Sequence, residues 1–371
     1  MSAPRLEIDL DKIHHNTQTL VQRLSRVGMS VTGISKAALG SPEIANIMLR
    51  AGVTSIGDSR IENIDVMRKA GVTAKTILTR SPMLSQVTQV AEIADMSLNT
   101  ELDVISQLSI AAKKAGRTHG VILMVELGDL REGIMPTELE HVVRKVLCFP
   151  NINLEGIGTN LACRSGVIPD SENMAELSSL VDAIEAKFGF RINVVSGGNS
   201  ANLKWALSGN KTGRINNLRL GESLLLGLDP LNRQPIDGLY TDTFKLVAEV
   251  IESGIKPSIP KGETAQCAYG KTSLAHDRGN VSQAILAIGL QDVDVNGLQP
   301  PAGIEILGAS SDHLVIDCGN HSLPVGAEVT FMVNYGALVD AMTSPFVAQV
   351  MQEDSIGIGQ RNLIMPLVSA A

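Results

Sequence analysis

Residues 31–37 read Val-Thr-Gly-Ile-Ser-Lys-Ala, a short run of β-branched and apolar residues that stops at a lysine. Such a run predicts a buried strand over residues 31–35. An amphipathic stretch at 43–50 follows, and then a second strand-like run at 54–57. A strand, a helix and another strand in this order indicate a parallel βαβ unit. The number of such units decides the fold.

The same alternation continues through the first two-thirds of the chain. We expect strands at residues 31–35, 54–57, 75–79, 95–98, 120–127, 153–159, 192–196 and 217–220. We expect helices at residues 10–24, 43–50, 60–70, 101–114, 137–147 and 172–187. Eight strands with helical connections over about 190 residues favour an α/β fold of the (β/α)8 TIM type. A doubly wound sheet is the alternative.

The pattern changes after residue 229. Prolines become frequent, and strand-like runs separated by Gly- and Asp-rich turns lie at residues 244–252, 283–288, 304–307, 313–317 and 328–333. Short runs with such turns indicate antiparallel strands. We therefore expect a barrel domain over residues 10–230 and a C-terminal β-rich domain over residues 231–371. The opening strand, within residues 1–9, is expected to join the β-rich domain.

Composition excludes several classes of protein. The 371 residues are 44% hydrophobic and 19% charged, with a formal net charge of −8. Negative charge argues against nucleic acid or an anionic membrane as the main partner. No apolar run reaches the roughly 20 residues that span a bilayer, and the opening residues do not resemble a signal peptide. Four widely spaced cysteines favour neither disulfides nor a metal site, so we expect a cytoplasmic protein without a metal.

Barrels of this type carry their chemistry at the carboxyl ends of the strands. The first expected strand ends at Lys36, where desolvation would favour the nucleophilic amine, although a solvated loop lysine is the alternative. The seventh strand runs into Ser-Gly-Gly-Asn-Ser at 196–200, and the eighth into Arg-Leu-Gly-Glu at 219–222. Glycine turns before helices suit a phosphate, although an ordinary N-cap explains the first turn equally well. Together with Arg131 on the same rim, they point to pyridoxal 5′-phosphate on Lys36.

Several motifs resemble, in order and spacing, those of the alanine racemase-type enzymes of fold type III, which bind pyridoxal phosphate on a barrel joined to a β domain. They are LEIDLD at 6–11, SKA at 35–37, GDSRIEN at 57–63, NSA at 199–201, RLG at 219–221 and AYGKT at 268–272. Within this superfamily the chain most resembles the ornithine racemases. That resemblance is carried by LGDLREG at 127–133, VSGGNS at 195–200, NLRLGES at 217–223, DTFKL at 242–246, AILAIG at 284–289 and ILGASSDHL at 306–314. It implies a homodimer that racemises a free amino acid, ornithine or another basic one.

The resemblance also implies a role for each matching residue. Lys36 would bind the cofactor through its amine and then act as a base on one face of Cα. The phosphate would be surrounded by Asn199, Ser200, Gly221, Glu222 and Thr343. Arg219 would face the pyridine nitrogen and leave it unprotonated, because a guanidinium keeps its proton. Arg131 and Asn160 would lie on the substrate side.

Four positions depart from the alanine racemase pattern. Leu290 and Gly40 stand where those enzymes carry tyrosines, Asn160 replaces a histidine, and Met124 replaces a lysine. The loss of large side chains at 40 and 290 would suit a long substrate.

The second catalytic base must differ from the family tyrosine, because a leucine at 290 cannot exchange a proton. Asp312 is the leading candidate, and Asp292 and His313 remain open. For His313, an ordinary structural histidine is an equally good interpretation.

Other activities on the same fold are the alternatives. A broad-specificity or alanine/serine racemase fits most of the same motifs. A D-threonine aldolase or D-serine dehydratase would carry a metal-binding His-x-Cys pair, which residues 340–371 lack, and His313, Cys318 and His321 lack a common metal spacing. A non-catalytic pyridoxal phosphate carrier resembles the barrel alone, and decarboxylases use a C-terminal cysteine motif that is absent here.

Overall fold

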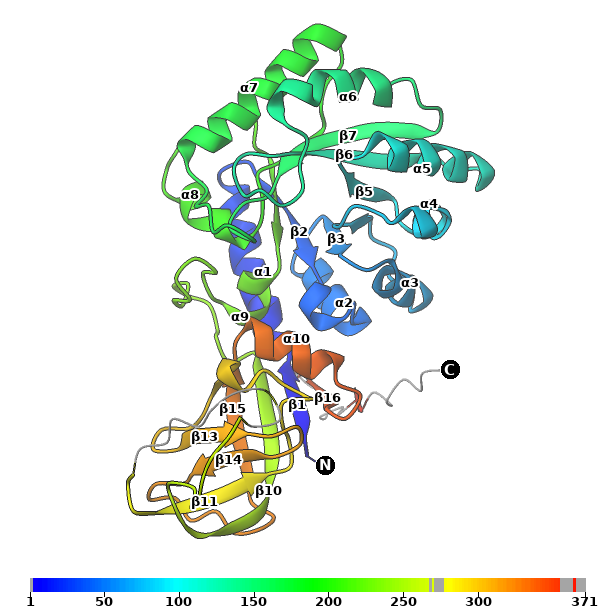
Figure 1. Ribbon diagram of the computed structural model, residues 1–371. Coiled ribbons are helices and arrows are strands. Elements are labelled where there is room, and N and C mark those ends of the chain that lie inside the picture. Colours follow the sequence, from blue (N-terminus) through cyan, green and yellow to red (C-terminus); the bar gives the residue numbers. More distant parts are fainter. Residues whose placement is uncertain (1–2, 267–268, 270–276, 354–362, 365–371) are drawn as a thin grey trace. The chain divides into compact units, whose positions relative to one another are not determined.

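The computed structural model describes residues 3–266, 269, 277–353 and, as backbone, 363–364 (Figure 1). The motif at 268–272 therefore lies outside the described residues except for Tyr269. The chain divides into two compact units, one of residues 12–241 and the other of residues 1–11 with 242–371.

The first unit is a closed barrel of eight parallel strands, so the predicted (β/α)8 fold is confirmed. Its strands are β2 (Ser30–Ile34), β3 (Ser55–Asp58), β4 (Thr76–Leu78), β5 (Met96–Asn99), β6 (His119–Val125), β7 (Ile152–Thr159), β8 (Val194–Ser196) and β9 (Asn217–Leu220). β9 pairs with β2, with Arg219 opposite Thr32. This closure excludes the doubly wound sheet, which leaves two edge strands.

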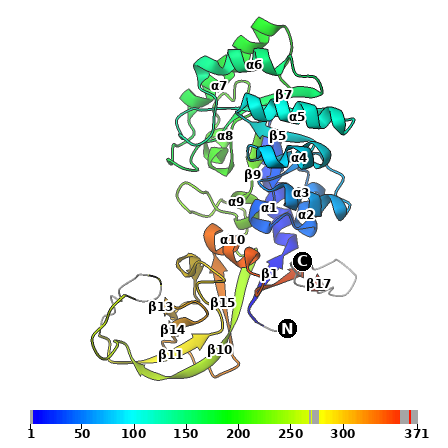
Figure 2. The ribbon, with the colours of Figure 1, turned by 45° about the vertical axis from the view of Figure 1, so that its right-hand side comes forward.

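Helices alternate with the strands and lie around the barrel (Figure 2). They are α1 (Leu10–Ser25), α2 (Pro42–Arg50), α3 (Ile61–Lys69), α4 (Val87–Ile93), α5 (Leu102–Lys114), α6 (Leu139–Val146), α7 (Ser171–Phe188), α8 (Leu203–Leu207) and α9 (Glu222–Leu226). Local signals set their ends: α7 begins at a capping box of Asp170 and Asn173 and ends at the left-handed Gly189. A helix was expected after the turn at 196–200, where α8 lies, but its bounds could not be given; like α4 and α9, it is too short to display a helical period.

The barrel strands bury an apolar cluster of Ile77, Met96, Leu98, Ile122 and Met124. These residues alternate along β4, β5 and β6, so they share one face of the barrel wall. The cluster fills part of the space between these strands, and buried polar residues lie on every strand of the barrel.

The second unit is built on a β-sheet in the order β13-β14-β11-β10-β1-β16-β17, in which β15 pairs with both β10 and β12. Its elements are β1 (Arg5–Asp9), β10 (Phe244–Pro257), β11 (Asn280–Leu286), β12 (Leu298–Gln299), β13 (Glu305–Ala309), β14 (Leu314–Asp317), β15 (Glu328–Val333), α10 (Tyr335–Thr343), β16 (Ala348–Gln352) and β17 (Leu363–Ile364). β1 pairs with β10 and β16. β10 extends five residues past the predicted end at 252, because β11 continues the pairing beyond a bulge between Val250 and Glu252.

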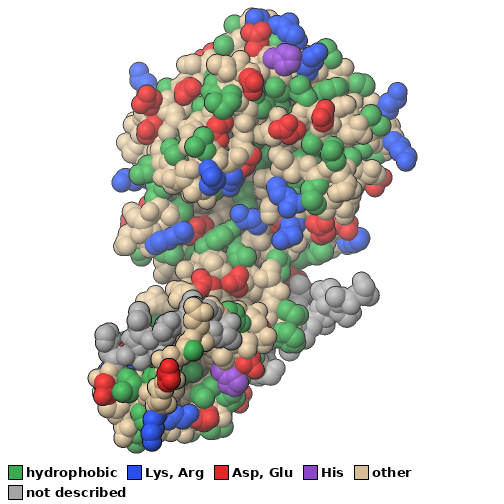
Figure 3. Space-filling view, viewed as in Figure 1, with side chains coloured by type: hydrophobic (Ala, Val, Ile, Leu, Met, Phe, Trp, Pro, Cys, Tyr) green, Lys and Arg blue, Asp and Glu red, His purple; other side chains and the backbone are tan. Residues whose placement is uncertain are grey.

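Surface charge and hydropathy set few limits on partners. Figure 3 shows Lys and Arg side chains interspersed with Asp and Glu over the visible face of the barrel unit. Among the described residues, none of the helices combines the length and apolar character that a membrane span needs.

Candidate functional site

Lys36 begins a short 3-10 turn, Lys36–Ala38, that follows β2. The turn closes back on Ser35, whose carbonyl accepts the N–H groups of Ala38 at 2.8 Å and Gly40 at 3.3 Å. The Lys36 side chain is exposed. Its exposure matches the alternative of a solvated lysine at the start of a loop, and desolvation of the amine remains a prediction. The strand ends one residue earlier than predicted, at Ile34, so Lys36 stands on the rim of the barrel.

The turns after β8 and β9 meet at the buried hydroxyl of Ser200. Its Oγ lies 2.9 Å from Ser223 Oγ and accepts long hydrogen bonds from the N–H groups of Gly221 at 3.4 Å and Ser223 at 3.3 Å. Hydroxyl and N–H groups that converge in this way suit the oxygens of a phosphate. The structure thus brings Ser200 and Gly221 together, and their phosphate role remains a prediction.

Asn199 and Glu222 flank these turns in different ways. Asn199 caps the turn after β8 through its own side chain, which accepts the Ala201 N–H at 2.8 Å. The Glu222 carboxylate forms an ion pair with Arg233. Burial raises the pKa of Glu222, and the charges of Arg233 and Lys36 oppose this rise.

Arg219 is a buried guanidinium whose partners are neutral. It donates to Ser196 Oγ at 2.6 Å, to the Thr159 carbonyl at 2.9 Å and to Asn160 Oδ1 at 3.3 Å. Among the described residues no carboxylate pairs with it. Burial lowers the pKa of Arg219 to about 10, which still leaves the group protonated at neutral pH.

Asn160 offers an unused donor beside this cation. Its Oδ1 accepts from Arg219 and, at 3.1 Å, from Asn199 Nδ2. Its Nδ2 is buried without a hydrogen-bond partner among the described residues. Since a buried donor is rarely left unpaired, this atom and the guanidinium mark a place for an acceptor from a ligand.

A chain of buried hydrogen bonds holds the partners of Arg219 in place. Ser196 Oγ donates to Asn217 Oδ1 at 2.9 Å, and Asn217 Nδ2 donates to Thr32 Oγ1 at 3.2 Å. Thr32 in turn bonds to Ser55 at 2.9 Å. Sequence reasoning missed Ser196 and Asn217 as site residues, although a polar side chain inside an otherwise apolar strand was a usable signal.

Arg131 lies in the loop that follows β6 and pairs with its neighbour Glu132. The loop is anchored by buried Asp129, which accepts the N–H groups of Arg164 and Ser165, both at 3.0 Å. These two residues belong to the turn after β7, so the carboxyl ends of β6 and β7 are tied together. Arg131 therefore lies on the predicted rim.

In the β-rich unit, Leu290 lies beside the segment that carries Asp312. The Leu290 N–H donates to the Ser310 carbonyl at 2.9 Å, and a Cβ on Gly289 would come within 2.5 Å of the Asp312 nitrogen. The exposed Asp312 carboxylate accepts from His313 Nδ1 at 2.8 Å, and this hydrogen bond lowers the pKa of Asp312. The backbone of Asp312 thus lies close to that of Gly289, next to the position where Leu290 replaces the family tyrosine.

The other residues considered in this unit have structural partners. Asp292 is buried and accepts a 2.7 Å hydrogen bond from Ser344 Oγ, so it holds the turn after α10. This makes Asp292 a weaker candidate base than Asp312. Thr343 ends α10, and its hydroxyl donates to the carbonyls of Val339 at 2.8 Å and Asp340 at 2.9 Å.

Position 40 does not open space for a substrate. Gly40 has a φ of +65°, and a Cβ there would lie 2.7 Å from Asn63 Cβ. The first turn of α3 already occupies this space. The expectation of a wider pocket at 40 is therefore not supported.

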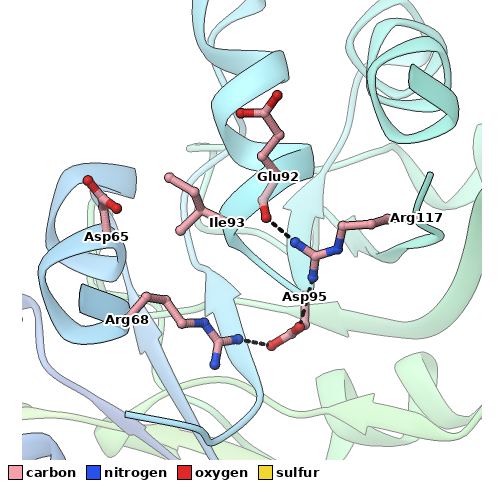
Figure 4. A pocket seen from close by; sticks show the side chains of 6 residues that line it. All are labelled: Asp65, Arg68, Glu92, Ile93, Asp95 and Arg117. Carbon is pink, nitrogen blue, oxygen red and sulfur yellow. Dashed lines mark hydrogen bonds and ion pairs between the residues drawn. The ribbon is translucent and has the colours of Figure 1, made fainter. Parts of the chain in front are cut away.

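A separate pocket of about 420 Å³ lies between α3 and α4, where β5 and β6 begin. Figure 4 shows that Asp95 there contacts both Arg68 and Arg117. Asp95 also accepts the Thr76 N–H at 2.8 Å. Because catalysis in this fold takes place at the opposite end of the strands, we assign this cluster to stability.

The substitution Asp95→Asn tests that assignment. It should lower the free energy of unfolding by about 1–3 kcal/mol, because it leaves two partly buried arginines short of an acceptor, and it should leave turnover unchanged. Urea unfolding measures the loss. As a control, Asp182→Asn removes an exposed pair with Arg214 and should cost less than about 1 kcal/mol. Equal stability of the two variants would contradict the assignment.

The described part of the chain contains no cluster of metal-binding side chains. There, no group of three His, Cys, Asp or Glu side chains is placed to hold a metal ion.

The structure combines a closed barrel, a lysine after the first barrel strand, turns suited to an anion after the last two strands, and a β-rich unit. This combination defines a class of barrel enzymes. Residues 8–230 match the family model described as alanine racemase, N-terminal domain. The ornithine racemase of Acetoanaerobium sticklandii is 37% identical over 348 residues, covering 93% of this chain and 98% of that protein. The lysine racemase of Thermotoga maritima is 38% identical over 354 residues, covering 95% and 99%.

A solved alanine racemase of Clostridium difficile 630 superimposes with a TM-score of 0.73 at 18% identity, covering 99% of this chain and 100% of that one. At this identity the likeness concerns the fold. The chain belongs to the alanine racemase family. The predictions of this family and of an amino-acid racemase, an isomerase, are confirmed.

Proposed function

We propose that the protein racemises ornithine or another basic amino acid at Cα, with pyridoxal 5′-phosphate as cofactor. The observation that carries this proposal is the nearly full-length similarity to two racemases named for basic amino acids. The matched segment includes Lys36, Arg131 and both anion-suited turns.

The residues present fit this cofactor. The converging donors at Ser200, Gly221 and Ser223 suit its phosphate. The unpartnered Nδ2 of Asn160 and the Arg219 guanidinium, paired only with neutral groups among the described residues, offer donors to its ring. Pyridoxal phosphate supplies an electron sink that makes the Cα proton of an amino acid acidic.

The chain's own residues then hold the reactants and move the proton. Lys36 would hold the cofactor through its amine and would exchange the proton on one face of Cα. Arg219 keeps its proton at neutral pH, so it would leave the ring nitrogen of the cofactor unprotonated and would limit side reactions. Arg131 binds the substrate carboxylate, for which the planar guanidinium is well shaped.

Inversion at Cα needs a second group on the opposite face. We assign this role to Asp312, which lies beside Leu290 in the β-rich unit. The resemblance to the alanine racemase family implies that the segment around Asp312 completes the site of the other subunit in a homodimer, so Asp312 would act across the interface. Light scattering should give a molar mass twice the 39.4 kDa of one chain.

The cytoplasmic location of the protein stays a prediction.

Proton NMR in D2O tests the proposal directly. The protein loaded with pyridoxal phosphate should erase the Cα proton signal of L-ornithine or L-lysine faster than that of alanine, serine or threonine. Chiral chromatography should find the D-isomer. Alanine or serine in the lead would favour the alanine/serine or broad-specificity alternative. Absence of exchange with every amino acid would contradict the racemase function and favour a carrier.

A further inference from the structure

Asp58 is a buried carboxylate that contacts the residue next to Lys36. It ends β3 and is 0% exposed. Its Oδ2 accepts a 2.8 Å hydrogen bond from Ser35 Oγ. Its Oδ1 accepts from the Arg60 N–H at 2.9 Å and from Asn63 Nδ2 at 3.0 Å. These three donors are neutral groups.

Such an arrangement is costly, so it needs an explanation. A buried carboxylate loses its hydration, and only strong hydrogen bonds to the charged form offset that loss. Burial raises the pKa of Asp58, while the donors from Arg60, Ser35 and Asn63 lower it. A serine at 58, with a single oxygen, would be enough to accept the Arg60 N–H at the start of α3. The carboxylate does more, because its second oxygen reaches across to the end of β2.

The end of the turn that carries Lys36 packs against α3, the helix that contains Asn63. Gly40, which bonds back to Ser35 through its N–H, packs so closely against Asn63 that a Cβ would lie 2.8 Å from the Asn63 carbonyl oxygen. Asn63 also donates to Asp58. The turn that carries Lys36 is thus held at its start by Ser35 and at its end by Asn63, and Asp58 joins the two contacts.

We propose that Asp58 is a positioning residue which, through Ser35 and Asn63, fixes the turn that presents Lys36 at the rim of the barrel. The inference rests on the proposed function for the role of Lys36, and on the contacts of this turn for everything else. The motif GDSRIEN at 57–63 contains both Asp58 and Asn63, and this contact network accounts for them.

Three variants separate this role from general stability. Ser35→Ala removes the bond between Asp58 and the turn, together with the longer 3.3 Å contact of the same hydroxyl with the Gly57 carbonyl. Asp58→Asn keeps the geometry, because its amide oxygen accepts from Arg60 and Asn63 while its NH2 group donates to Ser35 Oγ. Ser109→Ala is the matched control, since it also removes the hydroxyl of a buried serine, which donates to the Pro150 carbonyl on the outer side of the barrel.

Hydrogen exchange by mass spectrometry reads the order of the turn. Ser35→Ala should speed exchange of the amides of residues 36–41 by about tenfold, and Asp58→Asn by less than about threefold. Ser109→Ala should leave these amides unchanged. Equal exchange rates of the amides of residues 36–41 in Ser35→Ala and Ser109→Ala would overturn the proposal. An exchange rate in Asp58→Asn as high as that in Ser35→Ala would also overturn it.

A second readout follows the lysine itself. The rate at which added pyridoxal phosphate attaches to Lys36, measured by absorbance and peptide mapping, should fall by about tenfold in Ser35→Ala and stay within about twofold in the control. Reductive methylation of Lys36 by formaldehyde and cyanoborohydride needs no oriented reaction partner. Its rate should therefore stay within about twofold of the wild-type rate in both Ser35→Ala and Ser109→Ala. A parallel fall in both reactions would overturn positioning. If the wild-type protein attaches no pyridoxal phosphate to Lys36, the proposed function fails, and hydrogen exchange still decides the role of Asp58.

Discussion

Replacing Lys36 with alanine should lower the racemisation rate by about 10⁴-fold or more and abolish exchange of the Cα proton with solvent. The residue is expected both to hold the cofactor and to move the proton, so its loss removes two functions at once. Because its side chain is exposed on the rim, the substitution should leave the fold intact. Chiral chromatography and deuterium incorporation measure the two losses.

A matched control for this variant lies on α3. Lys69→Ala removes an exposed lysine that pairs with Asp65, four residues earlier on the same helix. Its turnover should equal that of the wild type. A Lys36→Ala protein that keeps more than about one-hundredth of the wild-type rate would contradict the assigned role of Lys36.

Replacing Asp312 with asparagine should lower racemisation by about 10²–10⁴-fold while sparing solvent exchange in one enantiomer. Lys36 would still exchange the proton on its own face of Cα, but no group would deliver a proton to the other face. Deuterium should therefore enter one enantiomer of the substrate without inversion. Circular dichroism separates inversion from exchange, and unfolding should be unaffected because Asp312 is exposed.

Two further variants decide among the candidates for the second base. Asp292→Asn should lower stability through loss of the Ser344 contact, without the split between exchange and inversion. If that split follows Asp292 or His313→Gln instead, the assignment of Asp312 is wrong.

Mixing the two inactive proteins tests whether Asp312 acts across a subunit interface. Dimers that contain one Lys36→Ala chain and one Asp312→Asn chain would hold one intact site. After subunit exchange, about a quarter of the wild-type activity should return. No recovery after proven exchange would place Asp312 in the site of its own chain or outside the site altogether.

The barrel and the place of Lys36 could be predicted from the sequence because the signals involved are local. Apolar runs such as 31–35 and 54–57 recur with amphipathic stretches between them, and parallel strands joined by helices leave few topologies. The glycine turns before α8 and α9 were visible for the same reason. The family followed from motifs that are contiguous in the chain.

The rest depended on contacts between residues far apart in sequence. The exposure of Lys36 depends on where β2 ends, and the filled space at Gly40 depends on Asn63 of the next helix. The length of β10 depends on its pairing with β11, past the bulge where local signals predicted an end.

The sequence by itself determined the fold class, the family and the lysine, since each is written in short periodic or contiguous patterns. The tertiary structure alone decided what surrounds that lysine. Asp58 joins Ser35 to Asn63, and Arg219 finds only neutral partners among the described residues because Ser196, Thr159 and Asn160 are the groups that β7 and β8 bring to it. Burial and hydrogen bonding of this kind arise only when the barrel closes, because closure removes water from these groups and sets their partners.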